Sequence, residues 1–392
     1  MGRGDLDHAV DSSTRGVGDL HAIGVNVVGL ALALLSLVLL SACSVLGAEP
    51  APEAESPVAT PEEGEPAPAE SPEPGGPVTL AFAGDTHFQL HLAELLDQPR
   101  GALGPISRAL GNADVTMVNL ESALTQGGSP APKELEDPAA RYWFRTAPAA
   151  LEVLADAGVD AVSVANNHGA DYGPEGLGDT LEAAENGPVA VLGVGRNRKT
   201  AFQAHRITVR GTDISLLAAD ASPRESASYI WEAGPNNPGI AAARSPRPPA
   251  LLAAVRAADR RGDVVVVYLH WGEEQQACPT PLQRSAARAL AEAGADVLVG
   301  SHAHVLLGSG WLGDTYVSYG LGNFLWYHNA QPDTGVLRLR VEDGTVVSDE
   351  WVPARIGTWG RPAPLRGPAA RQATDSWEQL RGGCAALAAS PS

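Results

Sequence analysis

The most constraining feature of this sequence is an uninterrupted apolar run at residues 264–269 that ends in a histidine-containing segment. A continuous run of valines and leucines is typical of a strand buried on both faces, as in a parallel sheet covered by helices. Segments with helical spacing lie on either side of it, at 249–260 and 281–293, and a second apolar run follows at 295–299. This alternation predicts an α/β fold.

The same alternation starts at residue 78. We expect strands at 78–82, 115–118, 159–164 and 189–194, and helices at 90–96, 106–110, 149–157 and 176–185. We also expect a hairpin at 207–218 and late strands at 315–319, 335–341 and 345–347. These later strands predict a mixed sheet and a core with two sheets. One domain is predicted at 78–360, followed by a Pro/Ala/Arg-rich C-terminal tail at 361–392 with helical character at 376–387.

The first segment resembles an export signal. Residues 23–40 are nearly all apolar and lead into Leu40-Ser41-Ala42-Cys43, which resembles the lipobox of bacterial lipoproteins. That resemblance implies lipid attachment at Cys43. The residues before the apolar run carry more Asp than Arg, so residues 1–43 are either a lipoprotein signal peptide with a later start or an uncleaved membrane anchor. Both alternatives place the rest of the chain outside the cytoplasm, anchored to the cell membrane.

Composition then explains residues 44–77. This segment is rich in Pro, Glu and Ala and lacks Lys and Arg, so we expect a disordered linker. It carries much of the formal net charge of −19. An acidic chain without a basic stripe argues against a nucleic-acid partner. Cys278 and Cys384 either pair in an oxidising compartment or stay free, and sequence separation does not decide between them.

Polar side chains that suit metal ions follow five of the expected strands, where each strand ends. They are Asp85 and His87, Asn119 and Glu121, Asn167 and His168, His270 and Glu273, and His302 and His304. Each alone is explained by a helix cap, a turn or a buried histidine. Ligands collect beyond the carboxyl ends of the strands in open α/β sheets, so the set together favours one shared site.

The segment Gly300-Ser301-His302-Ala303-His304 carries the clearest spacing. Residues two apart in an extended strand point to the same side, so both imidazoles are expected to enter one space. Mixed imidazole and carboxylate ligands suit Mn, Fe or Zn better than Ca. The set is large enough for two divalent metal ions about 3.5–4 Å apart, with Glu121 as the bridging carboxylate and His168 as a general acid.

Six ordered motifs resemble the CapA family of bacterial capsule, or poly-γ-glutamate, biosynthesis proteins, which is related to the calcineurin-like metallophosphoesterases. The motifs are Gly84-Asp85-Thr86-His87, Asn119-Leu120-Glu121, Ala165-Asn166-Asn167-His168, His270-Trp271-Gly272-Glu273-Glu274, Gly300-Ser301-His302-Ala303-His304 and Tyr319-Gly320-Leu321-Gly322-Asn323-Phe324. The resemblance implies a four-layer α/β/β/α metallophosphoesterase-like sandwich with a dimetal site between the sheets.

Residue by residue, the resemblance implies two sets of metal ligands. The first ion would take Asp85, His87 and His304, the second Asn167, His270 and His302, with Glu121 bridging and His168 as the catalytic imidazole. Where the phosphoesterases have a bridging Asp, this chain has Glu121, as CapA-type proteins do. Asn119, Glu273 and Asn323 are expected to support the ligands or contact substrate.

The resemblance implies two candidate functions in the making of an envelope polymer. One is hydrolysis of a phosphoester or polymer bond. The alternative is a non-catalytic, metal-containing factor for polymer assembly or export. The expected partners are the cell membrane through the lipid anchor, the envelope polymer, and membrane proteins that synthesise it.

Overall fold

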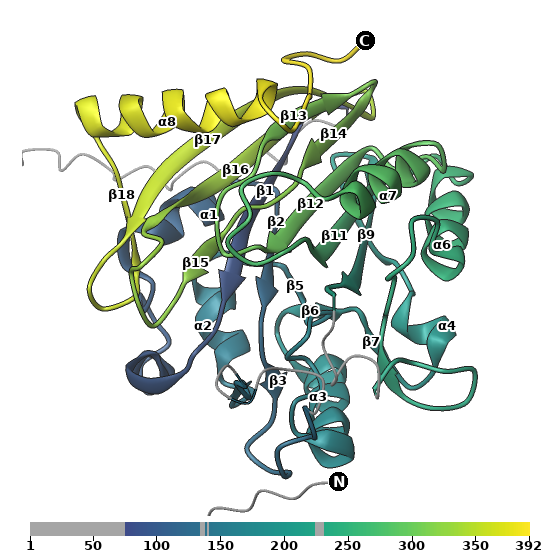
Figure 1. The fold of residues 1–392 in the computed structure, drawn as a ribbon, viewed down its shortest axis with the longest axis vertical. Coiled ribbons are helices and arrows are strands. Elements are labelled where there is room, and N and C mark those ends of the chain that lie inside the picture. The colour runs from purple at the N-terminus through teal and green to yellow at the C-terminus, as the bar shows by residue number, and fades with distance from the viewer. Residues whose placement is uncertain (1–74, 134–137, 139–140, 224–230) are drawn as a thin grey trace, which may run out of the picture. The chain divides into compact units, whose positions relative to one another are not determined.

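Two large β-sheets form the centre of the fold (Figure 1). The structure is a computed structural model, which describes residues 75–133, 138, 141–223 and 231–392. Cys43, the rest of the predicted signal segment and the linker up to residue 74 lie outside the described residues. Among the described helices, none is long and apolar enough to cross a membrane.

The first sheet has eight strands in the order β18-β17-β16-β1-β2-β5-β6, with β15 also paired to β1. Its strands are β1 (Val78–Thr86), β2 (Val115–Leu120), β5 (Ala161–Ser163), β6 (Ala190–Leu192), β15 (Asn323–Leu325), β16 (Asp333–Glu342), β17 (Thr345–Ile356) and β18 (Pro362–Pro364). The run β1-β2-β5-β6 is parallel, and β16, β17 and β18 add to it in antiparallel fashion.

The second sheet has six strands in the order β13-β14-β12-β11-β9-β8. Its strands are β8 (His205–Val209), β9 (Thr212–Ala221), β11 (Val264–Trp271), β12 (Val297–His302), β13 (Ser309–Leu312) and β14 (Thr315–Ser318). Two short pairs complete the described strands: β3 (Ala123–Leu124) with β4 (Arg145–Thr146), and β7 (Val194–Gly195) with β10 (Gly239–Ile240).

The helices lie in the connections between strands, except α8, which follows the last strand. They are η1 (Leu90–Leu96), η2 (Gly104–Ile106), α1 (Ser107–Gly111), α2 (Ala150–Asp156), α3 (Gly173–Asn186), α4 (Arg198–Ala201), α6 (Pro249–Asp259), α7 (Pro281–Ala291) and α8 (Gly367–Gly382). The mixed α/β fold with two sheets, predicted from the alternation of apolar runs, is confirmed.

Strand β11 shows how the second sheet is buried on both faces. Val266 and Tyr268 belong to the core cluster that also contains the side chains of β1 and β2, whereas Val265 and Val267 pack with α6 and α7. The Tyr268 hydroxyl donates a hydrogen bond of 2.7 Å to the carbonyl oxygen of Ala83 in β1. The second sheet therefore lies between the first sheet and two helices. The complete four-layer order stays a prediction.

The C-terminal segment continues the fold beyond the predicted domain limit at residue 360. Strand β18 pairs with β17, and α8 begins at Gly367, earlier than the helical character predicted at 376–387. Helix α8 lies along β17 (Figure 1). Trp377 of α8 is 3% exposed and stacks on Trp351 of β17, with ring centroids 5.2 Å apart. Residues 361–392 thus pack against the sheet.

The two cysteines whose pairing was left open form a disulfide. Cys278 precedes α7, Cys384 follows α8, and 106 positions separate them in sequence. The bond attaches the C-terminal segment to the second sheet's helical face.

Three other elements differ from their predicted form. The helix at 90–96 is a 3-10 helix, and the last predicted strand, 345–347, continues to residue 356. The strand predicted at 189–194 is interrupted at Gly193, whose φ is +82°. A Cβ at Gly193 would lie 2.3 Å from that of Ala165, so the chain passes too close there for another residue.

Candidate metal centre

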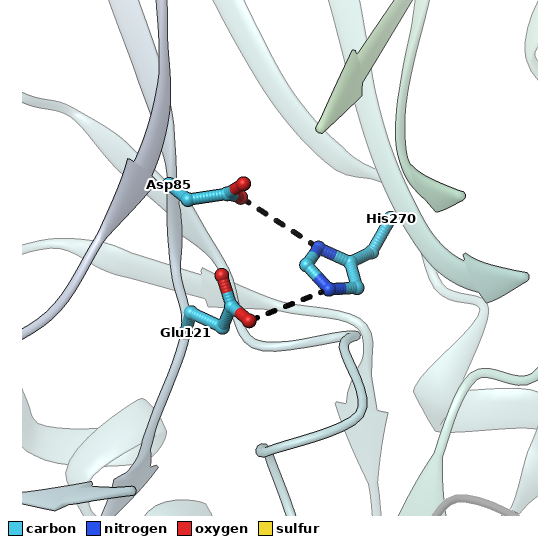
Figure 2. Close-up of side chains that lie close together, drawn as sticks. All are labelled: Asp85, Glu121 and His270. Carbon is cyan, nitrogen blue, oxygen red and sulfur yellow. Dashed lines mark ion pairs between the residues drawn. The ribbon is translucent and has the colours of Figure 1, made fainter. Parts of the chain in front are cut away.

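Three acidic or imidazole side chains meet where strands of both sheets end (Figure 2). Asp85 lies at the end of β1, Glu121 directly follows β2, and His270 lies near the end of β11. Each offers one ligand atom, and these atoms lie within 4.8 Å of one another. The His270 ring faces both carboxylates, with Nδ1 3.7 Å from Asp85 Oδ1 and Nε2 3.7 Å from Glu121 Oε1 (Figure 2). All three side chains are fully buried.

Two further atoms that could bind a metal ion lie close to the Nε2 atom of His270. Asn167 Oδ1 lies 2.7 Å from it and His302 Nδ1 lies 3.0 Å from it. With Glu121, these are the residues predicted for the second metal ion. The other ring nitrogen, Nδ1, faces Ser301 Oγ at 3.1 Å and Asn119 Nδ2 at 3.3 Å.

Asp85 contacts His302, His304 and Asn119. Its Oδ2 accepts a hydrogen bond of 3.0 Å from the backbone N–H of His302 and lies 3.5 Å from His304 Nδ1. The Asn119 amide donates to Asp85 Oδ1 at 2.9 Å, so Asn119, two positions before Glu121 in sequence, supports Asp85. Asn323 Oδ1 lies 2.8 Å from His304 Nδ1, which gives Asn323 a supporting position as well.

A close approach of two chain segments fixes the end of β1. The backbone N–H of Asp85 donates to the carbonyl oxygen of Gly322 at 2.8 Å. A Cβ on Gly84 would lie 1.9 Å from that same oxygen, so a glycine is required before Asp85. The motif Gly84-Asp85 is therefore explained by the packing that sets the carboxylate.

His302 and His304 face the same site, but not through extended backbone. Their φ angles are +91° and +57°, in the left-handed region that residues other than glycine rarely adopt. The two rings lie 6.1 Å apart between centroids, but the extended-strand argument does not describe the backbone that places them. Strain of this kind concentrates at functional sites because surrounding contacts must maintain it.

His87 is placed differently from the other predicted ligands. It is fully buried, but its Nδ1 accepts from the backbone N–H of Gln89 at 3.0 Å and its Nε2 faces the N–H of Tyr327 at 3.4 Å. Its ring packs against Trp326, with centroids 4.3 Å apart. The structure does not include His87 in the converging group, and its role as a ligand stays a prediction.

His168 lies beside the group with one ring nitrogen directed toward it. Its Nε2 is 3.8 Å from Glu121 Oε1, and its Nδ1 is 2.6 Å from Asp171 Oδ2. This placement agrees with a residue that acts next to a metal centre without being a ligand. Glu273, predicted as a supporting residue, is partly buried in the turn after β11, where its carbonyl oxygen accepts from the N–H of Gln276.

Burial sets the protonation of the imidazoles. It lowers the pKa of His302 to about 4, with the charge of His304 adding to the effect, and it holds the pKa of His270 well below its usual value. Both rings are then neutral at pH 7 and retain the lone pair that a metal ion needs.

Asp85 and His304 behave as an ion pair. Burial alone would raise the pKa of Asp85, but the hydrogen bond with His304 and the positive charge of His304 hold it below its usual range. Burial alone would lower the pKa of His304, but the contact with Asp85 and the charge of Glu121 raise it to about 10. The two buried carboxylates thus stabilise positive charge at the position of His304.

Several buried residues around the centre were missed from sequence. Asp220 lies beside His270 in the pairing of β9 with β11, and it accepts from Arg244 and Ser222, each at 2.6 Å. The hairpin was predicted to end at Ala218, three residues before β9 ends at Ala221, and the strand-end rule applied at the true end would have found Asp220. Asp171 and Lys133 lie in connecting segments and had no comparable signal.

The donor set fits divalent cations. Carboxylate oxygens, an amide oxygen and neutral imidazoles are the ligands that Mn, Fe and Zn accept together. Six of the seven predicted ligands contact another predicted ligand at 3.8 Å or less through the pairs described above: Asp85, Glu121, Asn167, His270, His302 and His304. A buried Asp, Glu and His group that could bind a metal ion is thus present.

Comparison with known proteins identifies the family. The model of the family "Bacterial capsule synthesis protein PGA_cap" matches residues 79–328. The chain belongs to this family. The PGA biosynthesis protein CapA of Bacillus subtilis (strain 168) is 28% identical over 313 residues, which cover 76% of each chain.

Two further PGA_cap relatives extend the comparison. The capsule biosynthesis protein CapA of Bacillus anthracis is 28% identical over 297 residues, covering 74% of this chain and 69% of that protein. A probable polyglutamine synthesis accessory protein of Mycobacterium tuberculosis (strain ATCC 25618 / H37Rv) is 26% identical over 262 residues, covering 62% and 66%. The resemblance to CapA proteins predicted from the six motifs is confirmed. All residues of the candidate metal centre lie within the matched PGA_cap region.

Proposed function

We propose that this chain is an extracytoplasmic protein of capsule or poly-γ-glutamate biosynthesis with a dimetal centre that hydrolyses a phosphoester or a polymer bond. The observation that carries the proposal is the convergence of Asp85, Glu121 and His270 at one buried point. Buried charged groups are costly unless an opposite charge balances them, so a group this acidic favours bound cations. The named relatives supply the biosynthetic context.

The residues divide into two ligand sets and one proton donor. Asn167, His270 and His302 would hold one ion, Asp85 and His304 the other, and Glu121 would lie between them. Bound divalent ions would supply the positive charge that stabilises the oxygens of a phosphoester in its transition state. Once protonated, the His168 ring would keep Nδ1–H on Asp171 and carry a second proton on Nε2, which it would deliver to the leaving oxygen, because the ring stands at the edge of the ligand group.

The test compares the purified protein with its His270→Ala variant after loading with Mn, Fe or Zn. We expect the wild type to hold metal ions and to hydrolyse bis-p-nitrophenyl phosphate, and the variant to lose metal affinity by about 10–100-fold, together with activity. His205→Ala is the matched control, since His205 is exposed in edge strand β8. Equal metal content in wild type and the His270 variant would disprove the metal centre.

A second candidate function is non-catalytic assembly or export of the polymer. The Mycobacterium tuberculosis relative carries the word "accessory" in its name, which favours a supporting role. In that case the metal ions stabilise the domain or bind the polymer. Stoichiometric metal without turnover of any phosphoester or γ-glutamyl substrate would support this candidate and exclude the hydrolase.

The proposed location is the outer side of the cell membrane, with a lipid at Cys43 and membrane polymer-synthesis proteins as partners. The disulfide between Cys278 and Cys384 supports this location, because such bonds persist in oxidising compartments. The apolar run before Cys43 and the acidic linker supply the anchor and the tether in this proposal.

A further inference from the structure

We propose that Asp171 and Lys133 form a buried positioning pair that fixes the ring of His168 at the metal centre. The catalytic consequence of this pair rests on the proposed function, whereas its effect on the His168 ring does not. Asp171 lies in the turn between β5 and α3, and Lys133 lies in the segment between β3 and β4.

Asp171 is the centre of the arrangement. Its side chain is fully buried, and its Oδ2 lies 2.6 Å from His168 Nδ1 while accepting a hydrogen bond of 2.7 Å from the backbone N–H of Phe144. Its Oδ1 lies 3.0 Å from Lys133 Nζ. One carboxylate thus joins the imidazole, the Lys133 segment and the strand end near Phe144.

Lys133 is the less expected member. Its side chain is fully buried, which is rare for a lysine and is costly unless the charge is paired. Its Nζ also lies 3.4 Å from His168 Nδ1, and the backbone N–H of Ala131 donates to the carbonyl oxygen of Asp171 at 2.7 Å. Lys133 therefore brings a charge close to the imidazole, and its segment makes a main-chain contact with Asp171.

The remaining contacts leave the His168 ring one orientation. The Phe144 ring stacks on the face of the His168 ring, with centroids 4.1 Å apart and an angle of 20° between the ring planes. The backbone N–H of His168 donates to Asn166 Oδ1 at 3.1 Å. With Nδ1 held by Asp171, only Nε2 is directed to the centre, where Glu121 Oε1 lies 3.8 Å away. The ring is fixed at its edge, at its face and through its backbone.

A purely structural role for the pair is a poor explanation. Replacing a buried ion pair by apolar residues of similar volume is often neutral or stabilising, so the fold gains little from keeping one. A pair that holds a proton-transfer residue in one tautomer would instead contribute to catalysis. Replacing both charges should then change the His168 tautomer and leave the stability of the fold intact.

The decisive variant is the double substitution Lys133→Met with Asp171→Leu, which leaves neither charge uncompensated. We expect its melting temperature to be equal to or above that of the wild type. In the ¹⁵N-edited spectrum of the metal-free protein, the His168 imidazole, assigned by its absence in His168→Gln, should change from a single Nδ1–H tautomer to a mixture. A spectrum identical to the wild type would overturn the proposal whether or not the protein is a hydrolase.

Kinetics give the second readout. If the wild type hydrolyses phosphodiesters, the double variant should lose about 10–100-fold in kcat on a diester with an alkyl leaving group, with little change in KM. The loss should be smaller on bis-p-nitrophenyl phosphate, whose leaving group needs less protonation. Equal losses on both substrates, together with a lowered melting temperature, would assign the pair a structural role.

Two further variants complete the design. Asp171→Asn keeps the volume and tests the carboxylate if the double variant does not fold; an unchanged tautomer and an unchanged leaving-group dependence would overturn the proposal. Asp263→Asn is the matched control, because Asp263 is a buried carboxylate paired with Arg206 and Arg261 that precedes β11, at the opposite end of the strand from His270. It should leave the His168 spectrum unchanged.

Discussion

At the scale of single residues, three aspartates stand directly before parallel strands, and each carboxylate accepts a backbone N–H of the neighbouring strand. Asp114, Asp160 and Asp296 precede β2, β5 and β12, and each donates its backbone N–H to a carbonyl of the neighbouring strand. The carboxylate of each accepts the N–H of that same neighbouring residue, at 2.7 or 2.8 Å. The repeated device sets the register of three parallel pairs.

The pH dependence of stability should report one of these aspartates. Burial raises the pKa of Asp296 to about 6. The folded value exceeds the unfolded one, so this contribution to stability is complete below about pH 4 and is lost as the pH rises through 6. Asp296→Asn keeps an acceptor for Val265 but does not titrate. Between pH 4 and 7, we expect the free energy of unfolding of the wild type to fall relative to that of the variant by on the order of 1–3 kcal/mol.

Urea denaturation of both proteins at several pH values measures this difference. Asp343→Asn is a suitable control, because Asp343 lies in the β16–β17 turn and away from any parallel strand start. Parallel profiles for the wild type and the Asp296 variant would contradict the prediction.

The site residues show what the sequence can predict at this scale. The strand-end rule selected Asp85, Glu121 and His270 because the carboxyl ends of parallel strands share one edge. It did not predict the left-handed backbone of His302 and His304, which depends on contacts such as that between His302 N–H and Asp85. It also missed Lys133 and Asp171, since no periodic pattern marks a residue buried from a connecting segment.

At the scale of elements, strands were predicted better than the segments that cover them. The apolar runs of β11 and β12 could be read directly, because a strand buried on both faces carries few polar residues. The beginning of α8 could not, because only Trp377 of that helix is buried and its partner Trp351 comes from a distant strand. The order of the strands also depends on long-range pairing that local sequence does not encode.

Removal of the Trp377 ring should measure how strongly α8 is attached. Trp377→Ala removes a buried ring that stacks on Trp351, so we expect the free energy of unfolding to fall by about 3–5 kcal/mol. Arg371→Ala on an exposed position of the same helix should change it by less than about 0.5 kcal/mol. Guanidinium denaturation decides the question, and equal effects of the two variants would show that α8 adds little to the core.

The disulfide should act on the same attachment. Its two cysteines are 106 positions apart, so the bond restricts a long loop in the unfolded chain. We expect Cys384→Ser to lower the free energy of unfolding by about 2–5 kcal/mol and reduction of the wild type to do the same. A wild type whose stability does not respond to reductant would contradict this expectation.

At the scale of the whole molecule, the described fold continues beyond the C-terminal end of the family match. The match ends at residue 328, whereas β16, β17, β18 and α8 follow it and pack on the sheet. The centre lies in the matched part, and the strands after it add to β1, which carries Asp85. From outside the matched region, β16 therefore pairs with the first half of the strand that leads to Asp85.

The attachment of the whole molecule to the membrane should depend on Cys43. If a diacylated cysteine is the anchor, its acyl chains supply about 0.8 kcal/mol per buried CH₂, enough to hold a domain whose described helices do not span a membrane. In a bacterial host with lipoprotein processing, we expect the wild type in the membrane fraction and Cys43→Ser in the soluble fraction, with Ser44→Ala as the control. Mass spectrometry of the N-terminal peptide should find the lipid on Cys43. A Cys43→Ser protein that stays in the membrane would instead support an uncleaved anchor at residues 23–40, because that segment does not need the thiol to remain in the bilayer.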